Sequence, residues 1–163
     1  MSDAPRAGAA ADRDGLVVRH AEASDHVRVL AVVDAWWGGR PMAAMLPRLF
    51  FVHFRPTSFV AEQGGRLAGF LCGFGSQTYP DEAYVHFVGV DPLLRGRGVG
   101  RLLYARFFDA ARADGRTMVR AVTSPANRGS VAFHTRLGFI AEEGGGEGYD
   151  GPGQDRVRLT RAL

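Results

Sequence analysis

Apolar residues between positions 85 and 115 first form a nearly continuous run and then recur at helical spacing. This change of spacing predicts a strand, a loop and a helix. Residues 85–90, VHFVGV, are mostly β-branched or aromatic, which is typical of a buried strand. Asp91 and Pro92 end that run. Helical spacing follows at Leu102, Leu103, Phe107, Ala110 and Ala111. We expect Gly115 to cap the end of this helix.

The rest of the chain predicts further strands and helices around this unit. Alternating or continuous apolar runs indicate strands at residues 16–19, 58–62, 67–75, 117–123, 140–142 and 156–160. Gly64 and Gly65 lie between the second and third of these strands, where a tight hairpin turn requires glycine. Helical spacing indicates helices at residues 25–37, 41–54 and 130–137.

The helix expected at residues 41–54 contains an irregularity. Met45, Leu49 and Val52 recur on one of its faces. Pro47 lies inside the segment, and proline lacks the N–H group that an inner helical turn requires. We therefore expect a second helix here with a kink at Pro47.

Length and composition indicate one compact domain. The chain has 163 residues, and we expect a disordered tail at residues 1–15 followed by a single domain at residues 16–163. Cys72 is the only cysteine and lies in an apolar run, so we expect a buried thiol in a reducing compartment. Because no apolar run is long enough to span a membrane, we expect a cytoplasmic protein with no membrane partner.

Glycine and arginine alternate in the predicted loop before the helix, at residues 95–101. Closely spaced glycines allow several backbone N–H groups to point at one anion, and the helix that follows adds the positive end of its dipole. A P-loop requires a lysine, and the chain contains none. A dinucleotide-binding loop requires a third glycine where Arg101 stands. The loop therefore predicts a phosphorylated ligand of another kind.

The loop and a second motif together resemble one family. Residues 95–100, RGRGVG, match the pattern R/Q-x-x-G-x-G/A, which is similar to the acetyl-CoA pyrophosphate loop of the GCN5-related N-acetyltransferases, the GNAT superfamily. Residues 127–139, NRGSVAFHTRLGF, resemble the next motif of that family, at the expected distance and in the expected order. The resemblance implies an α/β (α+β) fold, with a mixed, mostly antiparallel sheet of six to seven strands, helices on both faces and splayed central strands.

The resemblance also implies which residues hold the cofactor, acetyl-CoA. Backbone groups of the predicted strand would pair with its pantetheine arm, the loop would bind its pyrophosphate, and the second motif would contact the pantetheine. The implied residues are Val88, Gly89, Val90, Arg95, Gly96, Arg97, Gly98, Val99, Gly100, Arg101, Asn127, Ser130, Phe133 and His134. Asn127 can equally be the cap of the helix that follows it. Gly89 within a strand marks a bulge or a close approach by a ligand or another backbone.

Candidates for the chemistry lie in the same two motifs. The resemblance implies that the Val88 N–H stabilises the oxyanion. It implies that His134, where many relatives carry tyrosine, protonates the leaving thiolate, although His134 can instead contact the cofactor or support the fold. His86 and Tyr84 are candidates for the general base, and strict alternation predicts that His86 and Val88 share one face. Deprotonation through water is the alternative.

Two regions are candidates for the acceptor site. Trp36 and Trp37 end the first predicted helix, in the region that shapes acceptor pockets in the family, and one of them is expected to be core. Residues 142–155 form a glycine-rich, acidic segment with one aromatic residue, Tyr149. This segment is either a solvated loop or a flap that attracts a cationic amine and contacts it through Tyr149.

Taken together, these features predict direct acetyl transfer from acetyl-CoA to a primary amine of a small molecule or peptide, with no metal. The alternative is a non-catalytic acyl-CoA-binding regulatory module. A nucleic-acid binder is a third possibility, but the formal net charge is only +3 and the arginines cluster at the loop rather than with aromatic residues. We therefore expect no nucleic-acid partner. A homodimer is compatible with the family, and the sequence does not decide it.

Overall fold

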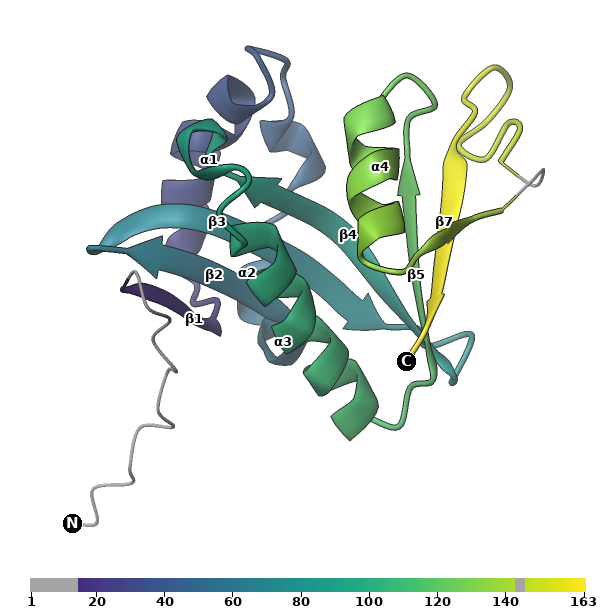
Figure 1. Cartoon of the computed structure of the whole chain (residues 1–163), viewed down its shortest axis with the longest axis horizontal. Coiled ribbons are helices and arrows are strands. Elements are labelled where there is room, and N and C mark those ends of the chain that lie inside the picture. The colour runs from purple at the N-terminus through teal and green to yellow at the C-terminus, as the bar shows by residue number, and fades with distance from the viewer. Residues whose placement is uncertain (1–14, 143–145) are drawn as a thin grey trace.

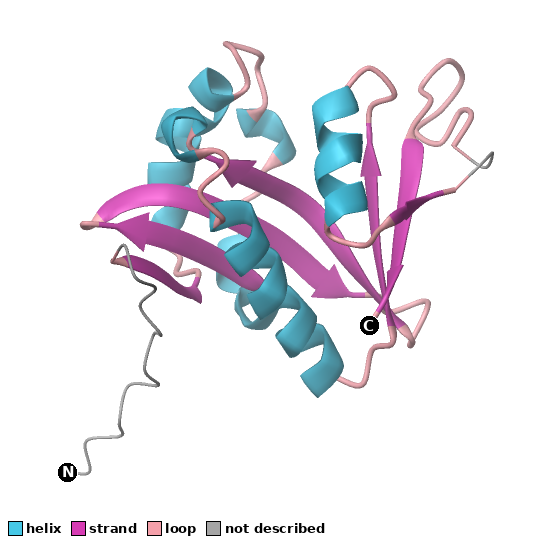
Figure 2. Ribbon diagram, in the orientation of Figure 1, coloured by secondary structure: helices cyan, strands magenta, loops and turns pink. Residues whose placement is uncertain are grey.

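The computed structural model describes residues 15–142 and 146–163 and contains one seven-stranded sheet with helices on both faces (Figures 1 and 2). The strands are β1 (Leu16–His20), β2 (Ser58–Gln63), β3 (Arg66–Gly75), β4 (Glu82–Val90), β5 (Met118–Thr123), β6 (Ile140–Ala141) and β7 (Val157–Ala162). The helices are α1 (Asp25–Trp36), α2 (Leu49–Val52), α3 (Val99–Ala113) and α4 (Arg128–Arg136), with 3-10 turns η1 (Ala43–Met45), η2 (Arg55–Thr57) and η3 (Pro92–Leu94). The tail predicted at residues 1–15 lies, apart from Gly15, outside the described residues. None of the helices in the described part is long and apolar enough to cross a membrane.

The sheet is mixed and mostly antiparallel, as the family resemblance implies. Its strand order is β1-β2-β3-β4-β5-β7-β6, and among the described strand pairs only β4 and β5 run parallel. Their pairing covers Glu82, Ala83 and Tyr84, although β4 continues to Val90. The two strands therefore diverge beyond Tyr84, which confirms the predicted splay at the centre of the sheet.

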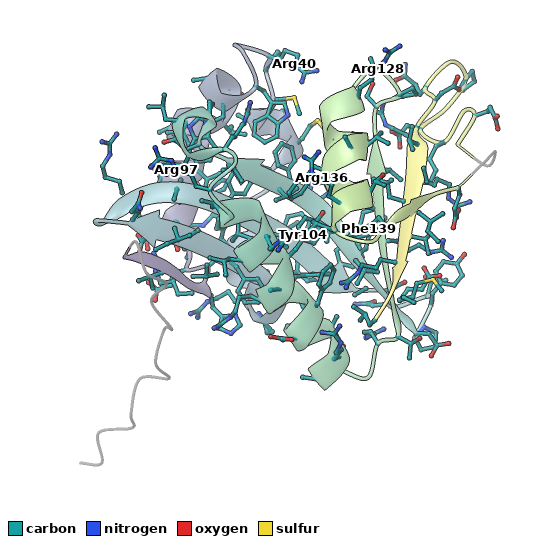
Figure 3. The ribbon with its side chains drawn as sticks, viewed as in Figure 1. Arg40, Arg97, Tyr104, Arg128, Arg136 and Phe139 are labelled. Carbon is teal, nitrogen blue, oxygen red and sulfur yellow. The ribbon has the colours of Figure 1, made fainter. Side chains whose placement is uncertain are left out.

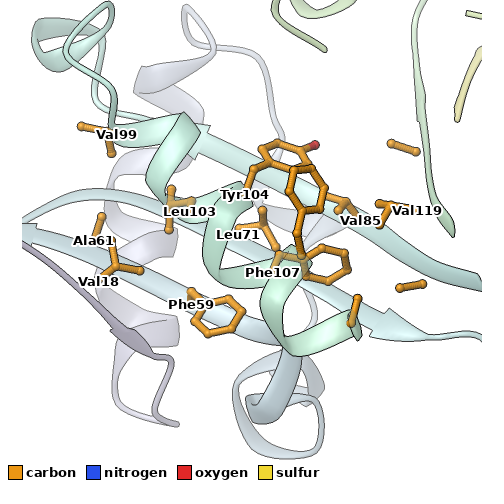
Figure 4. Packing of buried hydrophobic residues seen from close by; sticks show 14 of the residues in the cluster. Val18, Phe59, Ala61, Leu71, Val85, Val99, Leu103, Tyr104, Phe107 and Val119 are labelled. Carbon is orange, nitrogen blue, oxygen red and sulfur yellow. The ribbon is translucent and has the colours of Figure 1, made fainter. Parts of the chain in front are cut away.

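Two apolar clusters hold the helices to the sheet, one on each face. Leu103 and Phe107 of α3 are fully buried in the first cluster (Figure 4), and Phe133 of α4 packs against the same cluster. Val33 of α1 and Phe51 of α2 are fully buried in the second cluster, on the opposite face. Helices α3 and α4 thus lie together on one side of the sheet, and α1 and α2 lie on the other.

Local glycine signals predicted two connections correctly. Gly64 and Gly65, with φ of +56° and +76°, join β2 to β3 in a tight hairpin. Gly115, with φ of +74°, follows the end of α3, and its N–H donates to the carbonyl oxygen of Arg112. Both connections need a left-handed backbone, which glycine adopts at low cost.

The prediction of a single kinked helix at residues 41–54 is wrong. That segment forms the single turn η1 and the four-residue helix α2, and Pro47 lies between them. Met45, Leu49 and Val52, the residues of the expected face, are 48%, 42% and 41% exposed. The core instead takes the neighbouring Leu46, Phe50 and Phe51. The proline divides the segment, and each part then turns a different set of apolar residues inwards.

Strand β4 contains a bulge, which corrects the expectation that His86 and Val88 share a face. Cys72 of β3 opposes Phe87, but the next residue, Gly73, opposes Val85, so His86 has no partner across the ladder. Val85 consequently packs in the first cluster, which lies under α3 and is called the α3 cluster. Phe87 packs in the second cluster, which lies under α1 on the opposite face and is called the α1 cluster. His86 stacks on Phe50 of α2, and Val88 packs on the α3 side. The extra residue reverses the alternation on which the expectation relied.

The first turn of α1 is anchored by a cluster of charged residues around the buried Asp25. Asp25 is 1% exposed, and its carboxylate accepts hydrogen bonds from Arg19 at 2.8 and 2.9 Å, from Arg28 at 3.0 Å and from the Glu22 N–H at 2.8 Å. Burial alone would raise the pKa of Asp25, but the hydrogen bonds and the arginine charges outweigh it and lower the pKa. Glu62 of β2 completes the cluster by pairing with both arginines.

Candidate functional site

The diverging edge of β4 exposes backbone groups that no neighbouring strand uses. The N–H of Asp91, just after β4, donates to the carbonyl oxygen of Ala68 in β3 at 2.9 Å. Successive N–H groups in a strand point to alternate edges, so those of Val88 and Val90 point away from β3. They face the side where β5 has already separated from β4. This part of β4 therefore offers free donors to a ligand in the gap.

The loop after β4 brings a second set of free donors to the same place. Asp91 accepts the Leu93 N–H at 2.9 Å, which fixes the turn η3. Gly96 and Gly98 then adopt φ of +77° and +85°, and α3 begins at Val99. The Leu102 N–H reaches the Gly98 carbonyl, but in the described structure the N–H groups of residues 98–101 have no backbone acceptor. This is the open, positive end of a fifteen-residue helix.

One cavity of about 840 Å³ joins the strand edge, the loop and α4. Most of the residues predicted to hold a cofactor line it, namely Val88, Gly89, Val90, Arg95, Gly96, Gly98, Val99, Gly100, Arg101, Asn127, Ser130, Phe133 and His134. Arg97 is exposed and is not among the lining residues. Four arginines line the cavity, and no carboxylate side chain does so among the residues that the structure describes. The cavity is thus suited to an anionic ligand with an extended part that reaches the strand.

Small residues and caps position the two helices beside the cavity. A Cβ on Gly100 of α3 would lie 2.8 Å from Cζ of Phe133, so this glycine permits the close approach of α4. Asn127 lines the cavity and also caps α4, because its Oδ1 accepts the Ser130 N–H at 3.1 Å. The prediction of a helix cap is confirmed, and a cofactor contact by the same side chain stays a prediction.

The residues predicted for the acceptor at the end of α1 lie beside the loop, and their contact with an acceptor stays a prediction. Trp36 and Trp37 line the same cavity as the glycine loop, and Arg95 donates to the Trp36 carbonyl oxygen at 3.0 Å. Arg95 therefore ties the loop to the end of α1. A Cβ on Gly89 would lie 2.6 Å from the Phe70 ring and 2.8 Å from the Trp37 ring. Gly89 thus makes room for two aromatic rings, and the bulge of β4 lies at His86.

His134 is buried at the α3 side of the cavity, with both ring nitrogens in hydrogen bonds. It is 4% exposed; its Nδ1 lies 2.7 Å from the carbonyl oxygen of Ser130, and its Nε2 lies 2.6 Å from Oη of Tyr104. Burial lowers the pKa of the imidazole, and the contact with the Ser130 carbonyl offsets part of that effect. The proton-donor role that the family resemblance implies for His134 stays a prediction.

The other candidate residues gather on the opposite face of β4. His86 stacks on Phe50 at 4.6 Å between ring centres, and its Nε2 donates to the Met45 carbonyl oxygen at 2.6 Å. This bond leaves the lone pair of the neutral ring on Nδ1. Tyr84 lies on the same face, and burial, with a smaller contribution from Tyr149, raises its pKa. Tyr149 of the glycine-rich segment therefore reaches β4.

The acidic segment is less negative than its sequence indicates. Glu142 pairs with Arg120 and Arg158, and Asp150 pairs with Arg156 at 2.7 Å. The Asp155 carboxylate accepts the Gly148 N–H. Glu143 lies outside the described residues. Arginines thus pair with two of the carboxylates on which the flap hypothesis relies, Glu142 and Asp150.

Two arginines and a tyrosine of this region are among the residues that were not predicted from the sequence. Arg40, which follows α1, and Arg136 on α4 both line the cavity (Figure 3). Nothing local distinguishes them from the other arginines, because only the fold brings these two elements together. Tyr104 has the spacing of a core residue of α3, and its hydroxyl finds a partner only on α4.

Comparisons with known proteins agree with this geometry. A relative from Nocardia farcinica, L-2,4-diaminobutyric acid acetyltransferase, is 38% identical over 80 residues, which cover 49% of this chain and 42% of the relative. Mycothiol acetyltransferase from Gordonia bronchialis is 32% identical over 133 residues, covering 74% of this chain and 42% of that protein. The matches thus span less than half the length of these curated relatives.

A solved structure shares the fold. Diaminobutyrate acetyltransferase EctA from Paenibacillus lautus, in complex with L-2,4-diaminobutyric acid and coenzyme A, superposes with a TM-score of 0.70. Its sequence is 21% identical, and the match covers 90% of this chain and 94% of the other. The sequence model of the Acetyltransferase (GNAT) family matches residues 19–139, which include β4, the glycine loop, α3 and α4. This chain is therefore a member of the GNAT family of acetyltransferases.

Proposed function

We propose that this protein is an acetyl-CoA-dependent N-acetyltransferase that acetylates a primary amine of a small molecule or peptide. The observation that carries the proposal is the cavity in which two sets of unused backbone donors, at β4 and at α3, meet four arginines. Membership of the GNAT family supports it, as does the bound coenzyme A of the diaminobutyrate acetyltransferase that shares the fold.

The residues of the cavity fit this cofactor. Coenzyme A carries phosphate groups at one end and an amide-containing arm at the other. The N–H groups of residues 98–101 would bind the diphosphate, with Arg101 and Arg136 adding positive charge. The open edge of β4 would pair with the arm, as a strand pairs with its neighbour. When bound, acetyl-CoA supplies an acetyl thioester, whose acetyl group passes to the amine while coenzyme A leaves as the thiol.

Groups on and beside β4 would promote the transfer. The Val88 N–H points into the gap, where it would donate to the thioester oxygen as negative charge develops there. On the other face of the strand, Nδ1 of His86 would take the proton from the amine, since its Nε2 is held by the Met45 carbonyl. Tyr84 and Tyr149 would border the acceptor on that face. A cytoplasmic location and a possible dimer stay predictions.

Release of the coenzyme A thiol across a panel of amino acids, polyamines, aminoglycosides and peptides tests the proposal. We expect turnover with at least one amine, and the H86Q variant should lower kcat about 10²- to 10⁴-fold, since glutamine can donate to the Met45 carbonyl but has no basic nitrogen. H20Q is the matched control, because His20 on β1 also contacts a backbone carbonyl, that of Arg55. Saturable binding of acetyl-CoA without turnover would instead support an acyl-CoA-binding module.

A further inference from the structure

A buried polar contact links α3 to α4 at the wall of the cavity. Tyr104 is fully buried in the α3 cluster (Figure 4), and its hydroxyl is 2.6 Å from Nε2 of His134 on α4. Helix α3 begins at the end of the glycine loop, and α4 begins just after its cap, Asn127. The contact therefore joins the two helices whose first turns line the cavity.

The partners of His134 assign the hydrogen on its ring. The Ser130 carbonyl oxygen, 2.7 Å from Nδ1, can only accept a hydrogen bond, so Nδ1 must carry hydrogen. In the neutral ring Nε2 is then an acceptor, and the Tyr104 hydroxyl donates to it. The Ser130 hydroxyl lies 3.3 Å from Nδ1 and adds a second, longer contact there. Both nitrogens are thereby engaged, and neither offers a free N–H to the cavity.

The surroundings of the ring disfavour a charged imidazole. The rings of Tyr104, Phe133 and Phe139 all meet it edge-on, with interplanar angles of 80–87°. The hydroxyls of Tyr104 and Ser130 are the polar side-chain groups in contact with it from α3 and α4. The charged groups that line the same cavity are arginines, and in the described part no carboxylate joins them to balance an imidazolium. Burial also lowers the pKa of the ring.

We propose that Tyr104 is a positioning residue that holds His134 as a neutral imidazole with its hydrogen on Nδ1, so that His134 is a fixed wall of the cavity and not the proton donor to the leaving thiolate. The proposal rests on the function proposed above and differs from the role that the resemblance suggested for His134. No acid from this pair is needed for balance: the amine nitrogen loses one proton when the C–N bond forms, and the sulfur gains one when the C–S bond breaks.

The charge and tautomer of His134 are measured on the free protein by ¹⁵N NMR of its ring nitrogens between pH 5 and 8. We expect the neutral Nδ1–H tautomer at pH 7, with the pKa of the ring below that of an exposed histidine. In Y104F the hydroxyl that stabilises the neutral ring is lost, so the pKa of His134 should rise. A role in packing alone would lower the melting temperature of Y104F without moving that pKa. An Nε2–H tautomer, or a wild-type ring that is charged at pH 7, would overturn the proposal.

The kinetics of a conservative variant, H134Q, provide a second test of the proposal. In H134Q the side-chain oxygen can accept from Tyr104, but the amide has no acidic proton. We expect kcat within about tenfold of wild type, whereas loss of a general acid costs about 10²- to 10⁴-fold. H134L, which leaves the Tyr104 hydroxyl without its acceptor, should melt lower than H134Q. A hundredfold loss of kcat in H134Q with unchanged coenzyme A affinity would contradict the proposal. If no amine is acetylated at all, the proposed function fails, and the NMR result on the free protein still decides the role of Tyr104.

Discussion

Two glycines at opposite ends of α3 allow the cofactor loop to be tested against a matched control. Gly98 precedes the helix with φ of +85°, and Gly115 follows it with φ of +74°. A Cβ at either position meets nothing within 4 Å, so alanine there is strained by the backbone alone. The left-handed conformation costs an L-residue about 1–2 kcal/mol. The two substitutions therefore carry the same intrinsic cost in different places.

The free-energy cost of the strained alanine should lower the melting temperature in one variant and the affinity for coenzyme A in the other. For G115A we expect a melting temperature about 2–8 °C lower, since 1 kcal/mol corresponds to about 2–4 °C in a protein of this size. In G98A the loop is exposed and can relax the strain by moving, so the melting temperature should fall less. Coenzyme A must then restore the strained conformation when it binds, which weakens its affinity by about 5- to 30-fold.

Calorimetric titration with coenzyme A and thermal melting of the free proteins measure both quantities. The reasoning predicts that G115A binds coenzyme A like the wild type and that G98A does not. It is refuted if G98A matches the wild type in both melting temperature and affinity, because the cost would then appear nowhere. It is also refuted if G115A weakens binding as much as G98A, because the effect would then not belong to the loop.

Three further substitutions test the packing and charge of the molecule. D25N should lose about 3 kcal/mol of stability at pH 7. The pKa of the Asp25 carboxyl is lowered in the folded state, so the charged carboxylate stabilises the fold above the unfolded pKa, and this stabilisation is lost as pH falls through the folded pKa. Melts at pH 7 and pH 2.5 should therefore show a smaller difference in melting temperature between D25N and wild type in acid. G89A should cost about 1–3 kcal/mol, with altered tryptophan fluorescence, because its Cβ would lie 2.8 Å from the Trp37 ring; unchanged melting and fluorescence would contradict this. R136Q should weaken coenzyme A binding about two- to fivefold in low salt and less in high salt, while R106Q, on the same face of the sheet but outside the cavity lining, should leave binding unchanged.

Local signals in the sequence were sufficient for the central part of the site. The strand, glycine loop and helix at residues 85–115 can be predicted from residue spacing and from the left-handed backbone positions that glycine adopts at low cost. Both effects depend on residues close together in the sequence. The loop motif and the motif at residues 127–139 also carried the family resemblance, and the family match spans both. The residues predicted to hold the cofactor consequently line one cavity, with Arg97 as the exception.

Features set by distant partners could not be predicted in the same way. The bulge at His86 depends on the register between β3 and β4, and it moved His86 to the face opposite Val88. The hydroxyl of Tyr104 finds its acceptor on a helix about 30 residues away, and Arg95 finds its acceptor at the end of α1. Each of these contacts requires the folded arrangement of elements that look ordinary when taken one at a time.

The helix prediction for residues 41–54 was wrong for a different reason. Its helical spacing was real, but Pro47 separates it into two short turns whose orientation depends on the sheet beneath them. Phe50 and Phe51 fit against β2–β4 and were buried, while the expected face at Leu49 and Val52 was left exposed. Apolar periodicity alone does not say which of two overlapping faces the core will accept.

Titration of ¹⁵N-labelled protein with coenzyme A, followed through its backbone amide signals, tests the central claim most directly. If main-chain donors at α3 and along β4 hold the cofactor, the largest saturable shifts will fall on the amides of residues 98–101 and on Val88 and Val90. Largest shifts on the opposite face, at residues 146–156 or around His86, or no saturable shift at all, would contradict the account.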